Sequence, residues 1–332
     1  MFSSPRVWFI TGASTGFGYN LTRHALDKGD IVVATLRNPS TSDLPTKYPH
    51  ERLLLLKLDV TDTPAISSAF TTAREKFGRI DVVFNNAGHA ILCELENTPE
   101  DKARALFDTN FWGAVNVSKE AIKAFRANSP PGGRLLQNSS SSASTNNPGT
   151  AFYGASKAGT ANGTHISLRN LSHSGTYLVF PIFVDSFIPP ALEAMSESLA
   201  QELDPNWNIK ITLIESGPFN TAALGSNMLI LPPSEPYIPS TDPSQPLIGA
   251  NQTRLWISSG ELYKIAGDPV KGARVFYELG SREVKEEGGE KVKEPYERVV
   301  LHPYSVLAAE RRIGSVRRAV EAFEGEWKAW LE

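Results

Sequence analysis

A glycine-rich turn directly after a short apolar run constrains this chain more than any other feature. The run Arg6–Ile10 has the pattern of a buried strand, and it leads into a turn with glycines at positions 12, 16 and 18. A helical pattern follows and stops at Gly29. Glycines between a strand and a helix allow a tight turn and a close approach of the backbone to a pyrophosphate. The turn therefore predicts a nucleotide site, although a purely structural turn would look the same.

Strand-length apolar runs alternate with helix-length segments along most of the chain. Further strands are expected at 31–36, 53–58, 81–84, 134–137 and 209–215, with helices at 64–77, at 99–127 and around Tyr153. Such alternation is typical of a parallel sheet with helices on both faces. We therefore expect a doubly wound, Rossmann-type α/β fold with a mainly parallel sheet. Residues 1–332 would form a single domain with a C-terminal extension.

Composition excludes several other classes. The formal net charge is -3, which argues against a nucleic-acid partner. The single Cys93 cannot form an internal disulfide, and the six histidines lack metal-ligand spacing, so no metal is expected. The chain begins without a long apolar leader, and its most apolar stretch, 176–190, is interrupted by prolines and Asp185. We expect a cytoplasmic protein with no membrane span.

The end of the second expected strand bears on the choice of cofactor. A carboxylate there would bind a ribose 2′-hydroxyl, whereas an arginine can accommodate a 2′-phosphate. This chain has Arg37 at that place and no carboxylate nearby. The sequence therefore favours NADP(H) over NAD(H), with an ordinary surface cation as the alternative reading of Arg37.

Four polar residues could carry acid–base chemistry. Tyr153 and Lys157 share one helix face, where an ammonium would lower the pKa of the phenol from about 10 and suit it to proton transfer. Ser140 follows the fifth expected strand and could bind a substrate carbonyl, but the neighbouring serines leave its register open by one residue. Asn110 lies inside an expected helix and could position a water. Each of these residues alone has an ordinary structural alternative.

Taken in order, these elements resemble the short-chain dehydrogenase/reductase family. They comprise Thr-Gly-x-x-x-Gly-x-Gly at 11–18, Asp59-Val60, Asn-Asn-Ala-Gly at 85–88, Asn110, Ser140 and Tyr-x-x-x-Lys at 153–157. The resemblance implies that Tyr153 is the general acid–base and that Lys157 lowers its pKa and binds the nicotinamide ribose. Ser140 would orient the carbonyl, and Asn110 would hold a water that links Lys157 to solvent.

The resemblance also implies a set of cofactor-binding residues. Asp59 would contact the adenine amine, and Thr221 would contact the nicotinamide carboxamide. Ser216 departs from the proline usual in the family, which predicts a less rigid loop there. The full expected set is Gly12, Ser14, Gly16, Gly18, Arg37, Asp59, Asn86, Ala87, Gly88, Tyr153, Lys157 and Thr221.

An atypical insertion at 159–190 interrupts the helix that follows Lys157. Joining Ala158 to Ala191 would give one uninterrupted amphipathic helix. Two origins fit the sequence: a retained intron translated in frame, or a genuine lid or interface loop. The resemblance implies a homodimer packed along this helix, and the insertion would disturb both that dimer and the support of Tyr153.

We therefore expect an oxidoreductase that transfers a hydride between NADP(H) and a carbonyl or secondary alcohol. The alternative is a non-catalytic nucleotide-binding protein of the same fold, inactivated by the insertion. Residues 217–260 would form the substrate loop, and their apolar, proline-rich composition favours a lipophilic small molecule. Neither the particular substrate nor the physiological direction follows from the sequence.

Overall fold

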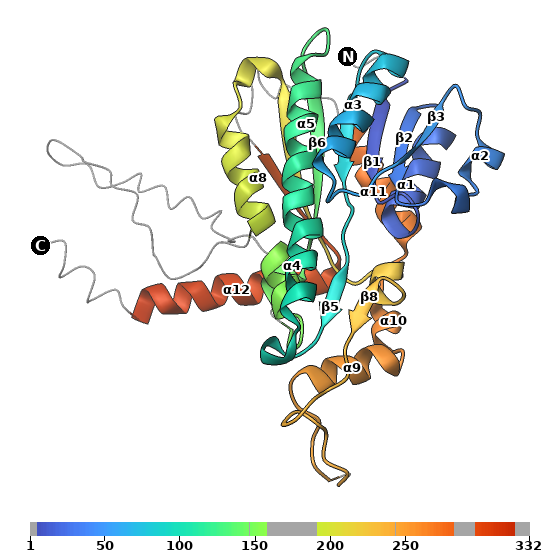
Figure 1. Ribbon diagram of the computed structural model, residues 1–332. Helices are drawn as coiled ribbons and strands as arrows, with labels where there is room; N and C mark the ends of the chain where they lie inside the picture. The colour runs from blue at the N-terminus through green and yellow to red at the C-terminus, as the bar shows by residue number, and fades with distance from the viewer. Residues whose placement is uncertain (1–4, 146, 158–190, 243, 282–295, 323–332) are drawn as a thin grey trace, which may run out of the picture.

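The computed structural model describes residues 5–145, 147–157, 191–242, 244–281 and 296–322 (Figure 1). A seven-stranded parallel sheet forms its centre, in the order β3-β2-β1-β4-β6-β7-β9. The order reverses between β1 and β4, and in such sheets ligands bind beyond the carboxyl ends of the strands at that point. The strands are β1 (Val7–Thr11), β2 (Ile31–Leu36), β3 (Leu53–Lys57), β4 (Val82–Asn85), β6 (Gly133–Ser140), β7 (Ile209–Ser216) and β9 (Tyr296–Leu301).

Helices cover both faces of this sheet (Figure 1). One layer holds α1 (Gly16–Asp27) and α11 (Pro269–Ser281), and the other holds α3 (Thr63–Phe77), α5 (Ala114–Arg126) and α8 (Ala191–Glu202). Successive residues of β1 alternate between the layers, because side chains along a strand point to opposite faces. Trp8 therefore packs in the core on the α1 and α11 side, and Phe9 in the core on the α3 and α5 side.

A smaller substructure lies beyond the carboxyl end of the sheet. It contains a two-stranded parallel sheet of β5 (Ala90–Leu92) and β8 (Met228–Ile230), with α9 (Ala250–Ser258) and α10 (Glu261–Ile265) beside it (Figure 1). The remaining helices are α2 (Leu44–Lys47), α4 (Glu100–Phe107), α6 (Ser142–Thr145), α7 (Ala151–Lys157) and α12 (Pro303–Ala322). Short 3₁₀ turns join several of these elements.

The expected doubly wound parallel fold is confirmed, with two local differences. The helix expected over 99–127 is divided into α4, a π-helical turn at Asp108–Gly113 and α5. β9 is an additional sheet strand that the sequence did not indicate, and it pairs with β7. Residues 231–246, within the expected substrate loop, contain no helix or strand among their described positions. The insertion at 159–190 lies outside the described residues.

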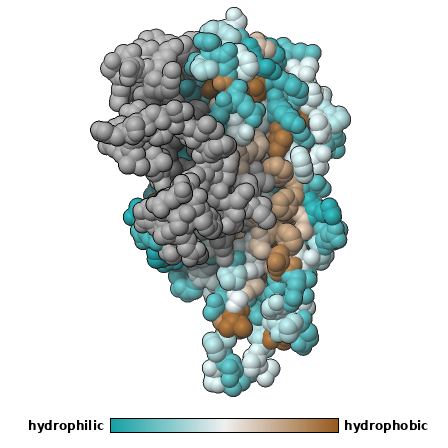
Figure 2. Space-filling model, turned by 90° about the vertical axis from the view of Figure 1, so that its left-hand side faces the viewer, coloured by the Kyte–Doolittle hydropathy of each residue, from teal (hydrophilic) through white to brown (hydrophobic). Residues whose placement is uncertain are grey.

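Where Figure 2 is coloured, the surface is mostly polar, with a strip of apolar residues running down it to the right of the grey atoms. Large apolar side chains are exposed at several positions, among them Trp112 at 55% and Leu307 at 53%. Within the described ranges, no helix is both long and apolar enough to span a membrane.

Candidate active site

A cavity of about 580 Å³ opens at the carboxyl ends of the central strands, where the strand order reverses. Every expected site residue except Gly18 and Asn110 lines it. The lining residues from that set are Gly12, Ser14, Gly16, Arg37, Asp59, Asn86, Ala87, Gly88, Ser140, Tyr153, Lys157 and Thr221. The topology thus collects residues from most of the chain at one crevice.

The glycine turn forms one wall of this cavity. Gly12 and Gly16 have φ angles of +67° and +55°, a backbone region that glycine adopts without strain. A Cβ on Gly12 would stand 3.0 Å from the Cα of Ala87, so a side chain would also close the cradle. Gly18 lies away from the cavity, and a Cβ there would meet the Gly12 carbonyl oxygen at 2.3 Å. Because Gly18 has no side chain, α1 can pack closely against the glycine turn.

The first turn of α1 suits an anion. Thr15 is the N-cap residue, yet its side chain makes no capping hydrogen bond, and no acidic residue occupies the first turn. The N-terminal N–H groups of the helix and its positive dipole end therefore face the cavity without an internal counter-charge. The cradle fits the pyrophosphate of a dinucleotide cofactor.

A chain of hydrogen bonds crosses the sheet beneath the cavity. The Ser216 hydroxyl donates to Oδ1 of Asn138 at 2.8 Å, and Nδ2 of Asn138 donates to Oδ1 of Asn86 at 3.0 Å. Nδ2 of Asn86 in turn donates to the Thr11 carbonyl oxygen at 2.9 Å. These four residues come from β7, β6, the residue after β4, and β1. The chain thus ties together the strand ends that carry the site.

Tyr153 and Ser140 meet at the inner end of the cavity. Ser140 is the last residue of β6, and Tyr153 lies in the middle of α7. Burial raises the pKa of the Tyr153 phenol above its ordinary value, and a hydrogen bond with the Ser140 side chain opposes that rise. Ser140 is thus the member of the serine run that pairs with the phenol. The lowering of the Tyr153 pKa by Lys157 stays a prediction.

Lys157 is buried at the end of α7. Its Nζ donates to the backbone carbonyl oxygen of Asn138 at 3.0 Å, which places the charge beside the hydrogen-bond chain. Burial lowers the pKa of this lysine to about 8, and the negative charge of Glu193 acts in the opposite direction. The ammonium is therefore poised to lose its proton at mildly alkaline pH.

Asn110 lies in the π-helical turn between α4 and α5 and is fully buried. Its Oδ1 accepts from the His89 backbone N–H at 3.0 Å, and its Nδ2 donates to the His89 carbonyl at 2.9 Å and to Ser156 Oγ at 3.1 Å. Insertion of an extra residue into the helical ladder turns this side chain inward. Its expected role in holding a water stays a prediction.

The missing side chain of Gly88 lets both Asn110 and Lys157 approach this part of the backbone closely. A Cβ at this position would stand 3.0 Å from Asn110 Oδ1 and 3.4 Å from Lys157 Nζ. The next residue, His89, is half-buried and also lines the cavity. Burial, followed by the charges of Arg37 and Lys157, lowers the pKa of His89 below its ordinary value.

Arg37 and Asp59 lie at the end of the cavity next to β2. Both side chains are exposed, and Arg37 directly follows the last residue of β2. Hydrogen bonds from Thr61 lower the pKa of Asp59, and the charge of Arg37 lowers it further. Asp59 Oδ1 accepts from the backbone N–H of Thr61 at 3.0 Å and from its hydroxyl at 2.8 Å. A cation and an oriented carboxylate thus stand side by side.

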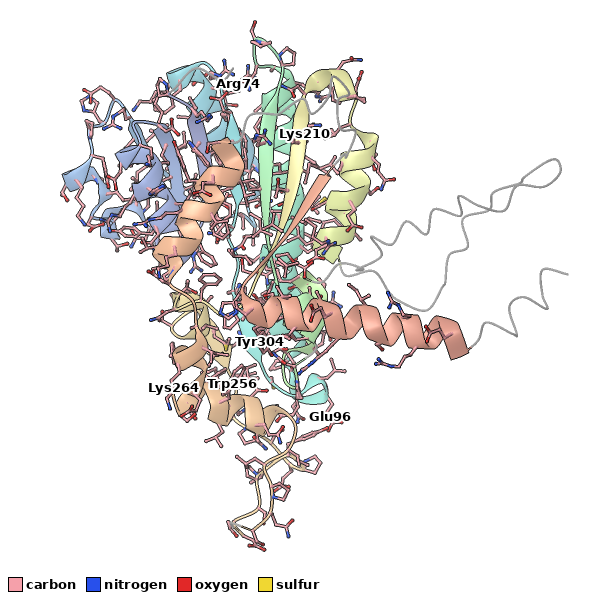
Figure 3. The ribbon with its side chains drawn as sticks, turned by 180° about the vertical axis from the view of Figure 1, so that it is seen from behind. Arg74, Glu96, Lys210, Trp256, Lys264 and Tyr304 are labelled. Atoms are coloured by element: carbon pink, nitrogen blue, oxygen red, sulfur yellow. The ribbon has the colours of Figure 1, made fainter. Side chains whose placement is uncertain are left out.

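The opposite arm of the cavity is largely apolar and is lined mainly by the expected substrate loop, with further residues from α10 and α12. Trp256 on α9 and Tyr304 on α12 line it, with ring centroids 6.1 Å apart (Figure 3). The other apolar lining residues there include Leu224, Met228, Leu229, Ile257 and Leu262. A molecule that reached Tyr153 through this arm would contact these apolar and aromatic side chains together with polar ones such as Asn227 and Thr253.

A buried ion pair fastens this loop to the rest of the fold. Nη1 and Nη2 of Arg254 on α9 donate to Oε1 and Oε2 of Glu94 at 2.6 and 2.7 Å. Nε of Arg254 also donates to the Leu231 carbonyl at 2.9 Å. The side chains of Arg254 and Glu94 are 13% and 5% exposed. The bidentate geometry fixes α9 over the cavity.

Among the described residues, no group of three or more His, Cys, Asp or Glu side chains could hold a metal ion. The groups that converge at the inner end of the cavity are instead a phenol, a hydroxyl and an ammonium. They can exchange protons and donate hydrogen bonds to an oxygen atom.

Comparison with known proteins agrees with this geometry. The family model for short chain dehydrogenases matches residues 6–179. An uncharacterised oxidoreductase of Schizosaccharomyces pombe is 35% identical over 69% of this chain and 65% of its own length. An oxidoreductase of Botryotinia fuckeliana is 33% identical over 84% of this chain and 86% of its own. A 3-ketodihydrosphingosine reductase of Bacteroides thetaiotaomicron is 30% identical over 65% of each chain.

Solved structures give the same result for the fold. A short-chain dehydrogenase from Streptomyces avermitilis has a TM-score of 0.74 and 24% identity, with 99% of each chain covered. The cavity, the glycine turn and the matching family model together define an oxidoreductase of the dinucleotide-binding α/β class. This chain belongs to the short-chain dehydrogenase family.

Proposed function

We propose that this oxidoreductase transfers a hydride between NADP(H) and a carbonyl or secondary alcohol of lipophilic character. The observation that carries the proposal is the convergence of Ser140, Tyr153 and Lys157 in the cavity that the glycine turn also lines. The apolar arm around Trp256 supports a lipophilic substrate. So does the relative named as a reductase of 3-ketodihydrosphingosine, a long-chain ketone.

The residues around the glycine turn fit a dinucleotide. The open N-terminus of α1 would hold the pyrophosphate, and Arg37 would pair with the 2′-phosphate of NADP(H). Asp59 would contact the adenine amine, and Thr221 would contact the carboxamide of the nicotinamide. Bound in this way, the cofactor supplies or accepts the hydride.

The protein's own residues would manage the proton. In the direction of reduction, the Tyr153 hydroxyl donates its proton to the substrate oxygen while the Ser140 hydroxyl donates a hydrogen bond to the same oxygen. The raised pKa of Tyr153 keeps the phenol protonated at neutral pH, which suits a proton donor. Lys157 would stabilise the phenolate that remains, and a water held by Asn110 would link Lys157 to solvent for the replacement proton.

The test is a screen of carbonyl compounds against the purified full chain with NADPH and with NADH. We expect oxidation of NADPH with ketones that carry alkyl or aromatic groups. The Tyr153→Phe variant is the matched control, because it removes one hydroxyl and leaves the cradle intact. Cofactor binding without turnover of any substrate, with the variant equal to the wild type, would instead identify a non-catalytic nucleotide-binding protein.

A further inference from the structure

A buried cluster of charges lies directly behind the candidate active site. Glu193 on α8 and Glu215 on β7 are 1% and 3% exposed. Arg298 on β9 donates from Nη1 to Glu193 Oε2 at 2.7 Å, and it also contacts Glu215 and Glu197. The sheet register places Ser139 opposite Glu215, so the cluster shares one face of the sheet with Ser139.

The cluster holds more negative charge than its cation can neutralise. One guanidinium faces three carboxyl groups, and Oε2 of Glu215 is buried without a hydrogen-bond partner among the described residues. Burial and the charge of Glu215 raise the pKa of Glu193 to about 7, against the opposing effects of Arg298 and Ser139. A proton on Glu193 relieves this excess, because a buried charge without full compensation is costly.

Ser139 connects this cluster to the active site. Its Oγ lies 2.8 Å from the Lys157 carbonyl oxygen and also contacts Glu193 Oε1. A hydroxyl carries one hydrogen, and a carbonyl oxygen accepts only. Ser139 can therefore serve both neighbours only if Glu193 is protonated and donates to Oγ, while Oγ donates to Lys157. An ionised Glu193 competes with the Lys157 carbonyl for the same hydrogen.

We propose that Glu193 is a proton-linked positioning residue of the active site, which acts on Lys157 through Ser139. When Glu193 is protonated, it donates to Ser139, and Ser139 holds the Lys157 carbonyl and thereby the last turn of α7. When Glu193 is ionised, Ser139 turns toward its carboxylate and the carbonyl loses this donor. The catalytic part of this inference rests on the proposed function.

The charged groups that act on Glu193 come from several elements. They are Glu215 of β7, Arg298 of β9, Lys157 of α7 and, through Arg298, Glu197 of α8 itself. The buried residues of α5 and of the π-helical turn are uncharged. The one charged residue of β6, Arg134, lies at the opposite end of the strand from Ser139. The balance at Glu193 is thus set within this cluster and Lys157.

The ¹³C NMR signal of the Lys157 carbonyl tests the proposed change of hydrogen bonding without a turnover assay. Lysines 102, 123, 157 and 328 each precede an alanine, so labelling with carbonyl-¹³C lysine and ¹⁵N alanine selects these peptide bonds. Comparison with Lys157→Arg identifies the signal. In the wild type the ¹³C shift should move between about pH 6 and 8 as Glu193 loses its proton.

Two variants frame that titration. Glu193→Gln should keep the wild-type shift of pH 6 through about pH 7, below the titration of the Lys157 ammonium, because its amide nitrogen still donates to Ser139 and its oxygen still accepts from Arg298. Ser139→Ala should show a different shift without the step that Glu193 causes near pH 7. A wild-type signal that stays constant, or a Glu193→Gln signal that moves as the wild type does, would overturn the proposal. Thermal melting confirms that each variant is folded.

Turnover provides a second readout at about pH 6, where Glu193 is protonated and its charge does not act on Lys157. Ser139→Ala should lower kcat about fivefold, the effect of one hydrogen bond of typical strength. Ser139→Thr keeps the hydroxyl, and Glu193→Gln keeps a donor to it. The kcat of each of these two single variants should stay within about twofold of the wild-type value. A folded Ser139→Ala variant with wild-type kcat contradicts the positioning role. Absence of turnover in the wild type would instead refute the proposed function, and the carbonyl titration would still decide the role of Glu193.

Discussion

Ser216 and Asn138, on neighbouring strands, are joined by a 2.8 Å hydrogen bond from the Ser216 hydroxyl to Asn138 Oδ1. The backbone carbonyl of the same Asn138 accepts from Lys157 Nζ at 3.0 Å. Ser216 is the position at which the family usually has proline, and proline could not make this contact. In this chain the serine therefore helps to fix the residue to which the buried lysine is bonded.

Tyr153→Phe should abolish most turnover while folding and cofactor affinity persist. The substitution removes the hydroxyl that would deliver the proton, and a general acid of this kind contributes about 10²- to 10⁴-fold to a rate. Steady-state kinetics and cofactor titration measure the two effects separately. Near-wild-type kcat in the variant would exclude Tyr153 as the proton donor.

Arg37→Glu should reverse the cofactor preference. A hydrogen bond to a charged group contributes about 1.5–3 kcal/mol, so loss of the phosphate partner should weaken NADPH binding about ten- to a hundredfold. The new carboxylate can accept from the ribose hydroxyl of NADH. Titrating both cofactors against both proteins gives the four affinities. Tighter binding of NADH than NADPH by the wild type would refute the assignment.

The alkaline limb of the pH–rate profile should report Lys157. Burial lowers its pKa to about 8, so the ammonium is lost as the pH rises through that value. Tyr153, whose pKa is raised, stays protonated over the same range. We expect kcat/KM for reduction to fall above about pH 8, since kcat/KM follows the free enzyme's titrations. Lys157→Arg keeps its charge and should move the limb to higher pH. An identical limb in both proteins would assign it to another group.

Removing one partner of the Glu94–Arg254 ion pair should destabilise the fold much more than replacing both partners by apolar residues. Arg254→Leu leaves a buried carboxylate without its partner, which typically costs about 3–5 kcal/mol. The double variant Glu94→Leu/Arg254→Leu should recover a large part of that loss. Urea unfolding of both variants measures the difference. A double variant less stable than Arg254→Leu would count against this account.

Deletion of residues 159–190 should raise stability, favour a dimer and increase turnover. Joining Ala158 to Ala191 would continue α7 into α8 as one amphipathic helix, able to hold Tyr153 and Lys157 and to pack against a second copy. Melting temperature, light scattering and kinetics follow the three effects. Sequencing of the mature transcript separates a retained intron from a genuine loop. A deletion variant that unfolds would disprove the prediction.

Local patterns were sufficient to predict the central fold. The apolar runs at 7–11 and 31–36 are buried on both faces, so their hydrophobicity alone marks them as strands. β5 and β8 have three residues each and exist because they pair across a long stretch of chain. β9 follows a charged segment and is defined by pairing with β7. Such long-range pairing leaves little trace in a local window.

The candidate site also contains residues that the sequence indicated and residues that only the structure reveals. Residue types and spacing brought attention to Tyr153, Lys157 and Arg37, because each chemistry depends on one or two side chains. The π-helical turn at Asn110 was not foreseen, because one widened turn is short compared with the window over which helical periodicity is read. In the sequence, nothing distinguishes Glu193 from an ordinary helix residue. Only its burial beside Ser139 reveals its contact with the site.

The attachment of residues 217–260 has a consequence for protein engineering. The contacts that hold this stretch include the three-residue pairing of β8 with β5, the Glu94–Arg254 contact, the hydrogen bond from Thr253 Oγ1 to the Pro148 carbonyl and a small cluster of apolar side chains. The phenol, the serine hydroxyl and the lysine lie on β6 and α7, outside it. We therefore expect that a stretch from a homologue that preserves these contacts can be transplanted to redirect selectivity while the reactive groups remain unaltered.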